Sequence, residues 1–207
     1  MYLCSNGIHE NMKRTIAAFD FDGTLTTRDS FPGFIRYATG TPRFVAGFLL
    51  FSPLLVLMKL GLYAGSKAKE QIFAHFFKGW EYRRFQALGQ AYASAVEAMR
   101  NEPVINRLKE HIANGDTVFV ISASIRDWVE PWCLQQGVDA VIATEAEVDA
   151  HGKLTGRFKT PNCNGDEKVK RMLQAEPDRS SYRLVAYGNS SGDKPLLDLA
   201  DEGTLCR

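Results

Sequence analysis

Four short apolar runs alternate with longer stretches of helical periodicity, and this alternation narrows the possible folds more than any other feature of the chain. The apolar runs, each with the length of a buried strand, lie at residues 15–19, 117–122, 140–144 and 182–188. The helical patterns cover about residues 103–113, 125–135, 166–175 and 194–200. Strands that alternate with helices form a parallel sheet with helices on both faces, so we predict an α/β fold with a Rossmann-like core.

The first and second runs are separated by about 90 residues, far more than a single crossover connection needs. Thr41–Pro42 and Ser52–Pro53 each place an N-cap residue before a proline, which favours a helix start at both positions. A small hairpin is expected around His151–Gly152, beside the sheet. We therefore predict a Rossmann-like core over residues 12–29 and 103–207, an inserted helical cap domain over residues 30–102, and a flexible tail over residues 1–11.

The composition is that of an ordinary soluble protein, with 45% apolar and 24% charged residues among 207 positions. A net charge of +1 gives no overall field that would favour nucleic acid as a partner. The four cysteines are scattered without a CxxC pair, so we expect reduced thiols, no zinc site and a cytoplasmic protein. The first 14 residues lack the charged and apolar segments of a secretory signal.

One part of the predicted cap is unusually apolar: residues 44–58 contain no charge, and Arg43 and Lys59 flank them. As a helix this stretch would measure about 22 Å, short of the hydrocarbon thickness of a bilayer, about 30 Å. Three interpretations stay open: two short helices packed inside the cap, an apolar hairpin that enters a membrane interface or receives a lipid tail, and a true membrane span. Pro53 weakens the third of these.

Polar side chains stand at the carboxyl ends of the expected strands, where ligands bind in parallel sheets. They are Asp20 and Asp22 after the first strand, Ser122 at the end of the second, Lys168 at the start of a later helix, and Asn189 and Asp193 after the fourth strand. Taken singly, each has a plain structural explanation, such as a turn, a helix cap or a solvated charge. Carboxylates that converge at one sheet edge repel each other, however, and a divalent cation with oxygen ligands, Mg²⁺, would remove that conflict.

This set of residues suits phosphoryl transfer. Asp20 can attack phosphorus and form an aspartyl-phosphate, while the cation and a lysine offset the charge of the phosphate. A second acid two residues on, Asp22, can protonate the leaving alkoxide and then deprotonate the water that hydrolyses the intermediate. Ser122 and Lys168 would hold the dianionic group opposite the metal.

The segments "DFDGTLT", "ISAS", "GDEKVKR" and "YGNSSGDKPLL" resemble, in this order, the four motifs of the haloacid dehalogenase superfamily. The resemblance covers about residues 15–200 and is strongest to the phosphatase branch with a helical cap between motifs one and two, which contains the phosphoserine phosphatases. It implies Asp20 as nucleophile and metal ligand, and Asp22 as acid/base and as a ligand through its backbone carbonyl. It also implies Ser122, Ala123 and Lys168 as phosphate-binding residues, and Asn189 and Asp193 as further Mg²⁺ ligands.

The fourth motif departs from the pattern of this branch, which usually has two acids four residues apart. Here the first position is Asn189, whose amide oxygen can coordinate with less charge, and only Asp193 is acidic. The residue type at the position of Asp22 distinguishes the activities within the superfamily. Dehalogenases are expected to lack an acid at this position and transport ATPases to have threonine, so Asp22 implies rapid hydrolysis of the phospho-enzyme.

The cap is expected to select the substrate. Its stretch "DSFPGFIRY", followed by the apolar residues 44–58, resembles the bacterial C-type phosphatidylglycerophosphate phosphatases. This implies a lipid phosphomonoester as substrate and peripheral contact with the inner membrane through residues 44–58. Two alternatives stay open: a phosphatase of phosphoserine or another small metabolite, and a non-catalytic pseudoenzyme that docks on membranes, which the asparagine at position 189 alone favours.

Overall fold

The computed structural model describes residues 13–206, and the tail expected at residues 1–11 lies outside this part of the chain. Its centre is a five-stranded sheet in the order β3-β2-β1-β6-β7, in which all neighbours are parallel. The strands are β1 (Arg14–Phe19), β2 (Thr117–Ile125), β3 (Ala140–Thr144), β6 (Tyr182–Gly188) and β7 (Glu202–Leu205). The predicted α/β fold is confirmed, and β7 adds an exposed edge strand to it.

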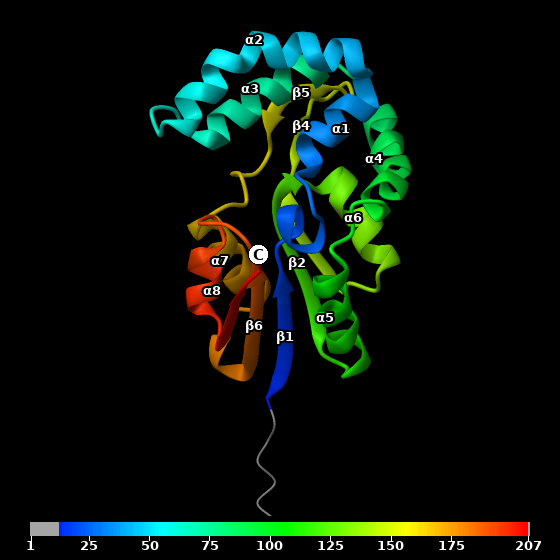
Figure 1. The fold of residues 1–207 in the computed structure, drawn as a ribbon. Coiled ribbons are helices and arrows are strands. Elements are labelled where there is room, and N and C mark those ends of the chain that lie inside the picture. The colour runs from blue at the N-terminus through cyan, green and yellow to red at the C-terminus, as the bar shows by residue number, and fades with distance from the viewer. Residues whose placement is uncertain (1–12, 207) are drawn as a thin grey trace, which may run out of the picture.

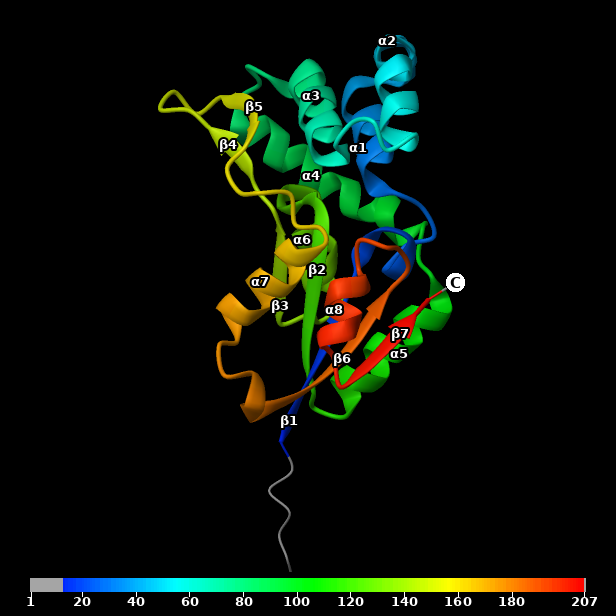
Figure 2. The ribbon, with the colours of Figure 1, turned by 90° about the vertical axis from the view of Figure 1, so that its left-hand side faces the viewer.

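Helices cover both faces of the sheet (Figures 1 and 2). One face carries α5 (Glu102–Ala113) and α6 (Arg126–Gln135), and the other carries α7 (Asp166–Ala175) and α8 (Lys194–Leu199), with the short helix η2 (Arg179–Ser181) before β6. Alternate residues of β1 enter two apolar clusters: Ala17 and Phe19 pack with α5 and α6, while Ile16 and Ala18 pack with α7 and α8. Burial on both faces explains why β1 is apolar along most of its length.

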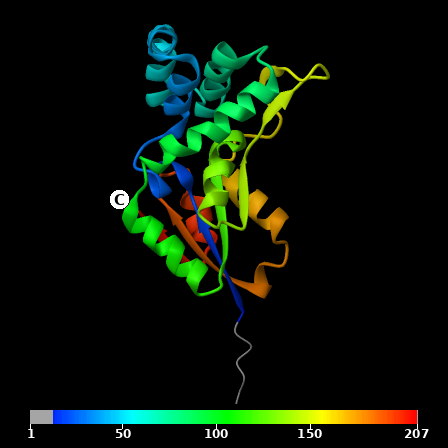
Figure 3. The same ribbon diagram turned by 90° about the vertical axis from the view of Figure 1, so that its right-hand side faces the viewer.

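Four helices between β1 and β2 lie beyond the carboxyl ends of the strands (Figures 1 and 3), and we call them the cap helices. They are α1 (Ser30–Thr39), α2 (Thr41–Lys59), α3 (Gly65–Phe77) and α4 (Tyr82–Glu97). The cap helices share the apolar cluster of α5 and α6, since the ring of Phe34 stacks on Trp128 with 4.5 Å between centroids. This continuous packing holds the cap helices above the sheet edge that carries the polar residues.

A hairpin of β4 (Ala146–Val148) and β5 (Leu154–Phe158) extends from the core sequence up to the cap helices (Figure 2). The hairpin was expected beside the sheet, but it packs on α3. Gly79 N donates to Leu154 O at 2.7 Å, and Phe158 N donates to the Glu70 carboxylate at 2.8 Å. The cap helices are therefore attached to the rest of the chain by this hairpin as well as by the ends of the insertion.

Residues 44–58 lie within one continuous helix, α2, so the expectation of two short helices or a hairpin is wrong. Pro53 is accommodated because the hydrogen bond it cannot donate to Leu49 O is replaced: the Ser52 hydroxyl donates to this carbonyl at 2.8 Å. By length and composition α2 could cross a membrane. One face packs on the apolar cluster through Phe48 and Phe51. The other exposes Val45, Leu49, Leu50, Val56, Leu57 and Met58.

Candidate active site

Asp20 stands directly after β1, at the centre of the sheet edge. Its backbone N–H donates to Tyr187 O of the neighbouring strand β6 at 2.8 Å, which fixes where the side chain leaves the sheet. The carboxylate accepts hydrogen bonds from Lys168 Nζ at 2.6 Å and from the Thr24 hydroxyl at 3.0 Å. Burial raises the pKa of Asp20 to about 6 even though Lys168 acts in the opposite direction, and the nearby Asp193 and Asp22 raise it further.

Lys168 lies in the first turn of α7 and is buried at the same edge. Its ammonium donates to Asp20, to Ile121 O at 2.7 Å and to Asp193 at 2.6 Å, so all three N–H groups have partners. Burial opposes its charge, but the two carboxylates raise the pKa of Lys168 above its usual value. The structure thus brings together the lysine of the third motif with acids of the first and fourth, as the sequence motifs predict.

Asp193 organises the loop after β6. One carboxylate oxygen accepts from Lys168, and the other accepts from the backbone N–H groups of Asn189 and Ser190 and from the Ser190 hydroxyl. Burial opposes the charge of Asp193, yet Lys168 and Ser190 together lower its pKa. Both oxygens of Asp193 are therefore engaged in holding the lysine and the loop.

Asp22 points away from this cluster, toward the cap helices. Its carboxylate accepts from the backbone N–H of Ser30 at 2.7 Å and from the Ser124 hydroxyl, so it touches both α1 and the end of β2. Burial raises the pKa of Asp22, and Asp29 adds to this effect. An acid with a raised pKa at the junction between cap and sheet is suited to donate and accept a proton.

The turn η1 (Phe21–Leu25) follows Asp20 directly and contains Asp22, and Gly23 makes this turn possible. The φ of Gly23 is +80°, which favours glycine, and a Cβ at this position would lie 2.0 Å from Asn189 Nδ2. The side chain of Asn189 thus lies against Gly23, in the turn that follows Asp20. The first and fourth motifs are in direct contact at this point.

The end of β2 carries the second motif on an irregular stretch of strand. Its register against β3 shifts between Ser122 and Ile125, which takes Ala123 and Ser124 out of the regular ladder. The buried hydroxyl of Ser122 accepts from Ser124 N at 3.0 Å. Ala123 O accepts from the Thr144 hydroxyl at 2.9 Å. This bulge presents the backbone of the second motif at the same sheet edge as Asp20.

Several residues of the site were not predicted as site residues from the sequence. The backbone of Ser30 holds Asp22 from outside the motifs, whereas the hydroxyl groups of Thr24 and Ser124, which also hold the two aspartates, lie within the first and second motifs but were given no role there. Lys69 of α3 also reaches the site and donates to Ala123 O at 3.0 Å. One signal exists for Lys69: Ile72, Phe73 and Phe76 follow it at helical spacing, so a charged residue stands on the buried stripe of an apolar helix.

The residues around Asp20 offer oxygen ligands to a metal ion. They are the Asp20 carboxylate, the Asp22 backbone carbonyl and the Asn189 amide, a donor set that suits a hard cation such as Mg²⁺. Within residues 13–206 no group of three His, Cys, Asp or Glu residues has the spacing of a metal site, so neutral oxygens would supply part of the coordination. The raised pKa of Asp20 agrees with a site that gains from added positive charge.

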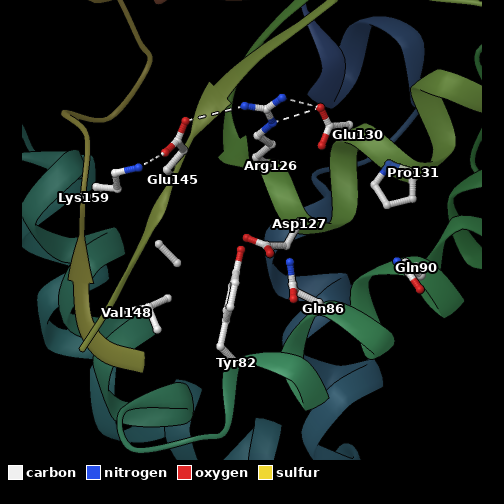
Figure 4. Close-up of a pocket in the computed structure, with 11 residues that line it drawn as sticks. Tyr82, Gln86, Gln90, Arg126, Asp127, Glu130, Pro131, Glu145, Val148 and Lys159 are labelled. Atoms are coloured by element: carbon white, nitrogen blue, oxygen red, sulfur yellow. Dashed lines mark hydrogen bonds and ion pairs between the residues drawn. The ribbon is translucent and has the colours of Figure 1, made fainter. Parts of the chain in front are cut away.

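A cavity of about 630 Å³ lies elsewhere, between α4, α6 and the start of the hairpin (Figure 4). Four of its charged residues pair with one another: Arg126 contacts Glu130 at 2.5 Å and Glu145 at 3.6 Å, and Lys159 contacts Glu145 at 3.0 Å. The Tyr82 hydroxyl points toward Asp127 (Figure 4). The lining includes none of the motif residues, so we place the chemistry at the sheet edge and not in this cavity.

Comparison with known proteins agrees with this geometry. Residues 17–198 match the family described as haloacid dehalogenase-like hydrolase. The Protein CicA of Caulobacter vibrioides is 33% identical over 190 residues, covering 90% of this chain and 83% of that protein.

Two solved structures are similar in fold. A Bordetella pertussis Tohama I protein described as having unknown function has a TM-score of 0.78 at 23% identity, covering 90% of this chain and 87% of its own. A phosphoserine phosphatase, in a form described as a phospho-aspartyl intermediate analogue, has a TM-score of 0.63 at 18% identity, covering 91% and 84%.

Proposed function

The chain belongs to the haloacid dehalogenase-like hydrolase family, and from this premise we propose that it is a Mg²⁺-dependent phosphomonoester phosphatase that works through an aspartyl-phosphate. The observation that carries the proposal is the buried cluster in which Lys168 contacts Asp20 and Asp193, with Asp22 held separately toward the cap. In the proposed activity, Asp20 would be the nucleophile, Lys168 the cation and Asp22 the proton carrier of one site. We also propose that residues 30–102 act as a cap domain over the core.

In the first step, a carboxylate oxygen of Asp20 attacks phosphorus while the bond from phosphorus to the ester oxygen breaks. Lys168 and Thr24 hold the Asp20 carboxylate and fix its orientation. Asp22, protonated at this stage, gives its proton to the leaving alkoxide, which departs as the alcohol. Its raised pKa favours the protonated form that this step needs.

In the second step, water attacks the phosphorus of the aspartyl-phosphate, and Asp22 now accepts the proton of that water. The bond from phosphorus to Asp20 breaks, inorganic phosphate leaves, and the Asp20 carboxylate is restored. The transferring group would be held by the Ser122 hydroxyl, the Ala123 backbone N–H and Lys168. The buried position of Ser122 and the bulge at Ala123 support this assignment.

A Mg²⁺ ion would be held by Asp20, by the backbone carbonyl of Asp22 and by Asn189, and Asp193 would hold a metal-bound water or bind the ion directly. When bound, the ion would neutralise charge between the carboxylates and the phosphate. Asparagine at position 189 keeps an oxygen ligand there but removes one negative charge.

For the substrate we propose a lipid phosphomonoester such as phosphatidylglycerophosphate, reached by peripheral contact of α2 with the inner membrane. Leu49 is 69% exposed and Leu50 is 64% exposed, and Leu60 and Leu62 after the helix are exposed as well. Residues 30–69 contain no acid and five basic residues, which favours an anionic lipid surface. Exposed apolar side chains with basic neighbours are typical of helices that lie in a membrane interface.

A substrate panel tests the proposal. We expect Mg²⁺-dependent release of phosphate from lipid phosphomonoesters in mixed micelles, lost in Asp20→Asn and on chelation. Turnover of phosphoserine with none of any lipid would favour the small-metabolite alternative. If neither p-nitrophenyl phosphate nor any other member of the panel releases phosphate, while the protein still binds anionic vesicles, the pseudoenzyme alternative is correct.

A further inference from the structure

Lys69 is a cation from the cap that reaches the catalytic edge of the sheet. It lies on the stripe of α3 that also carries Ile72, Phe73 and Phe76, all of which are buried. Its ammonium donates to Ala123 O at 3.0 Å and stands over the ring of Phe31, 5.0 Å from its centroid. These two contacts direct the end of the side chain toward the second motif and not toward solvent.

The contacts leave most of the hydrogen-bonding capacity of Lys69 unused. An ammonium has three N–H groups, and Ala123 O is its one hydrogen-bond partner among residues 13–206. No carboxylate in this part of the chain lies within ion-pair distance of it, unlike Lys168, which has two. Burial lowers the pKa of Lys69, while Asp22, Asp29 and Asp20 act in the opposite direction. A partly buried cation with spare donors binds an anion well.

The geometry of the proposed displacement indicates which part of the substrate lies near Lys69. Displacement at phosphorus is in line, so the leaving alcohol lies opposite the attacking oxygen. Asp20 attacks from the end of β1, and the alcohol must therefore extend away from the sheet, toward the cap helices. The transferring phosphate already has Ser122, Ala123 and Lys168 on the core side. Lys69 comes from the cap side, where the alcohol lies.

We propose that Lys69 selects phosphomonoesters whose leaving alcohol carries a second anionic group, a phosphodiester or a carboxylate, a few bonds from the scissile ester. The proposal rests on the phosphatase activity proposed above and assigns its substrate class. Lys69 is then a specificity-determining residue: its ammonium binds the second anion and leaves the chemistry to the residues of the four motifs.

Matched substrate pairs test this assignment. 3-Phosphoglycerate and glycerol 3-phosphate differ by a carboxylate in place of a hydroxymethyl group. Short-chain phosphatidylglycerophosphate has a phosphodiester in its leaving alcohol, whereas phosphatidic acid of the same chain length has none. For each pair the measured quantity is the ratio of kcat/KM values, which does not depend on how much of a variant is folded.

We expect the wild type to prefer the member with the second anionic group in at least one pair. The pair that shows this preference identifies whether a carboxylate or a phosphodiester is bound. In Lys69→Met this ratio should fall by about tenfold to a hundredfold, because a charged hydrogen bond is lost. Lys69→Arg should keep most of the preference. The control is Lys67→Met, which removes the same charge from an exposed position two residues away and should leave the ratio unchanged.

A ratio that stays the same in Lys69→Met, or that falls equally in Lys67→Met, would overturn the assignment while leaving the phosphatase intact. Absence of turnover with all four compounds and with p-nitrophenyl phosphate would instead refute the proposed activity itself. The two failures are therefore distinguishable in the same set of assays.

Discussion

Replacing Lys168 by methionine removes the cation that two buried carboxylates share, and we expect a large loss of stability that depends on pH. The ammonium lies 2.6 Å from Asp20 and 2.6 Å from Asp193, and it is 1% exposed. Removing one partner of a buried ion pair costs about 3–5 kcal/mol. We expect the free energy of unfolding of Lys168→Met to fall by about this amount at neutral pH.

The loss should shrink as the pH falls, because Asp20 can then be protonated. Burial raises the pKa of Asp20 to about 6, above the value of about 3.9 in an unfolded chain. The folded state therefore holds this proton more tightly, so the charged carboxylate destabilises the fold above about pH 6 and the cost disappears toward about pH 4. Without Lys168 the pKa of Asp20 rises further, and the relief begins at a higher pH.

Urea unfolding of metal-free protein at about pH 7.5 and about pH 5 measures both effects. The matched control is Lys170→Met on the same helix, whose exposed side chain lies 3.7 Å from Glu167 and should change stability by less than about 1 kcal/mol. A loss in Lys168→Met below about 1 kcal/mol at about pH 7.5, or one that grows on acidification, would refute the reasoning.

Three further predictions follow from the same geometry. Mg²⁺ should raise the melting temperature more at about pH 7.5 than at about pH 5, because Asp20, with a pKa of about 6, is charged at the higher pH and mostly protonated at the lower. An equal rise at both pH values would argue against Asp20 as a ligand. Gly23→Ala should lose activity at least about tenfold, because a Cβ at φ +80° meets Asn189; wild-type rates would contradict this contact. The double substitution Leu49→Glu and Leu50→Glu should abolish sedimentation of the protein with anionic vesicles and leave p-nitrophenyl phosphate turnover unchanged. Persistent vesicle binding would exclude α2 as the membrane contact.

Four strands of the core could be predicted from the sequence because most of their residues are buried between helices on the two faces of the sheet, so each strand is largely an apolar run. The runs at 140–144 and 182–188 coincide with β3 and β6. β7 could not be predicted in this way, because all four of its residues are exposed and its pairing with β6 exists only in the folded sheet.

The cap was harder to predict because local signals compete there with tertiary contacts. Ser52–Pro53 is a reasonable helix start, yet the same serine hydroxyl satisfies Leu49 O and lets α2 continue through the proline. In the site, the motif residues Asp20, Lys168 and Asp193 meet as predicted. Lys69 belongs to no motif; its place on the buried stripe of α3 is a local signal, but its contact with Ala123 depends on how α3 lies over the sheet, which no local pattern encodes.

The central claim is that Asp20 accepts the phosphoryl group and that Asp22 is needed to release it. Its most direct test is the intact mass of Asp22→Asn, quenched in acid during turnover with Mg²⁺, followed by peptide mapping. We predict that one phosphoryl group accumulates on the Asp20 carboxylate and disappears in Asp20→Asn. Unchanged turnover in Asp22→Asn, or a phosphoryl group on any other residue, would contradict the account.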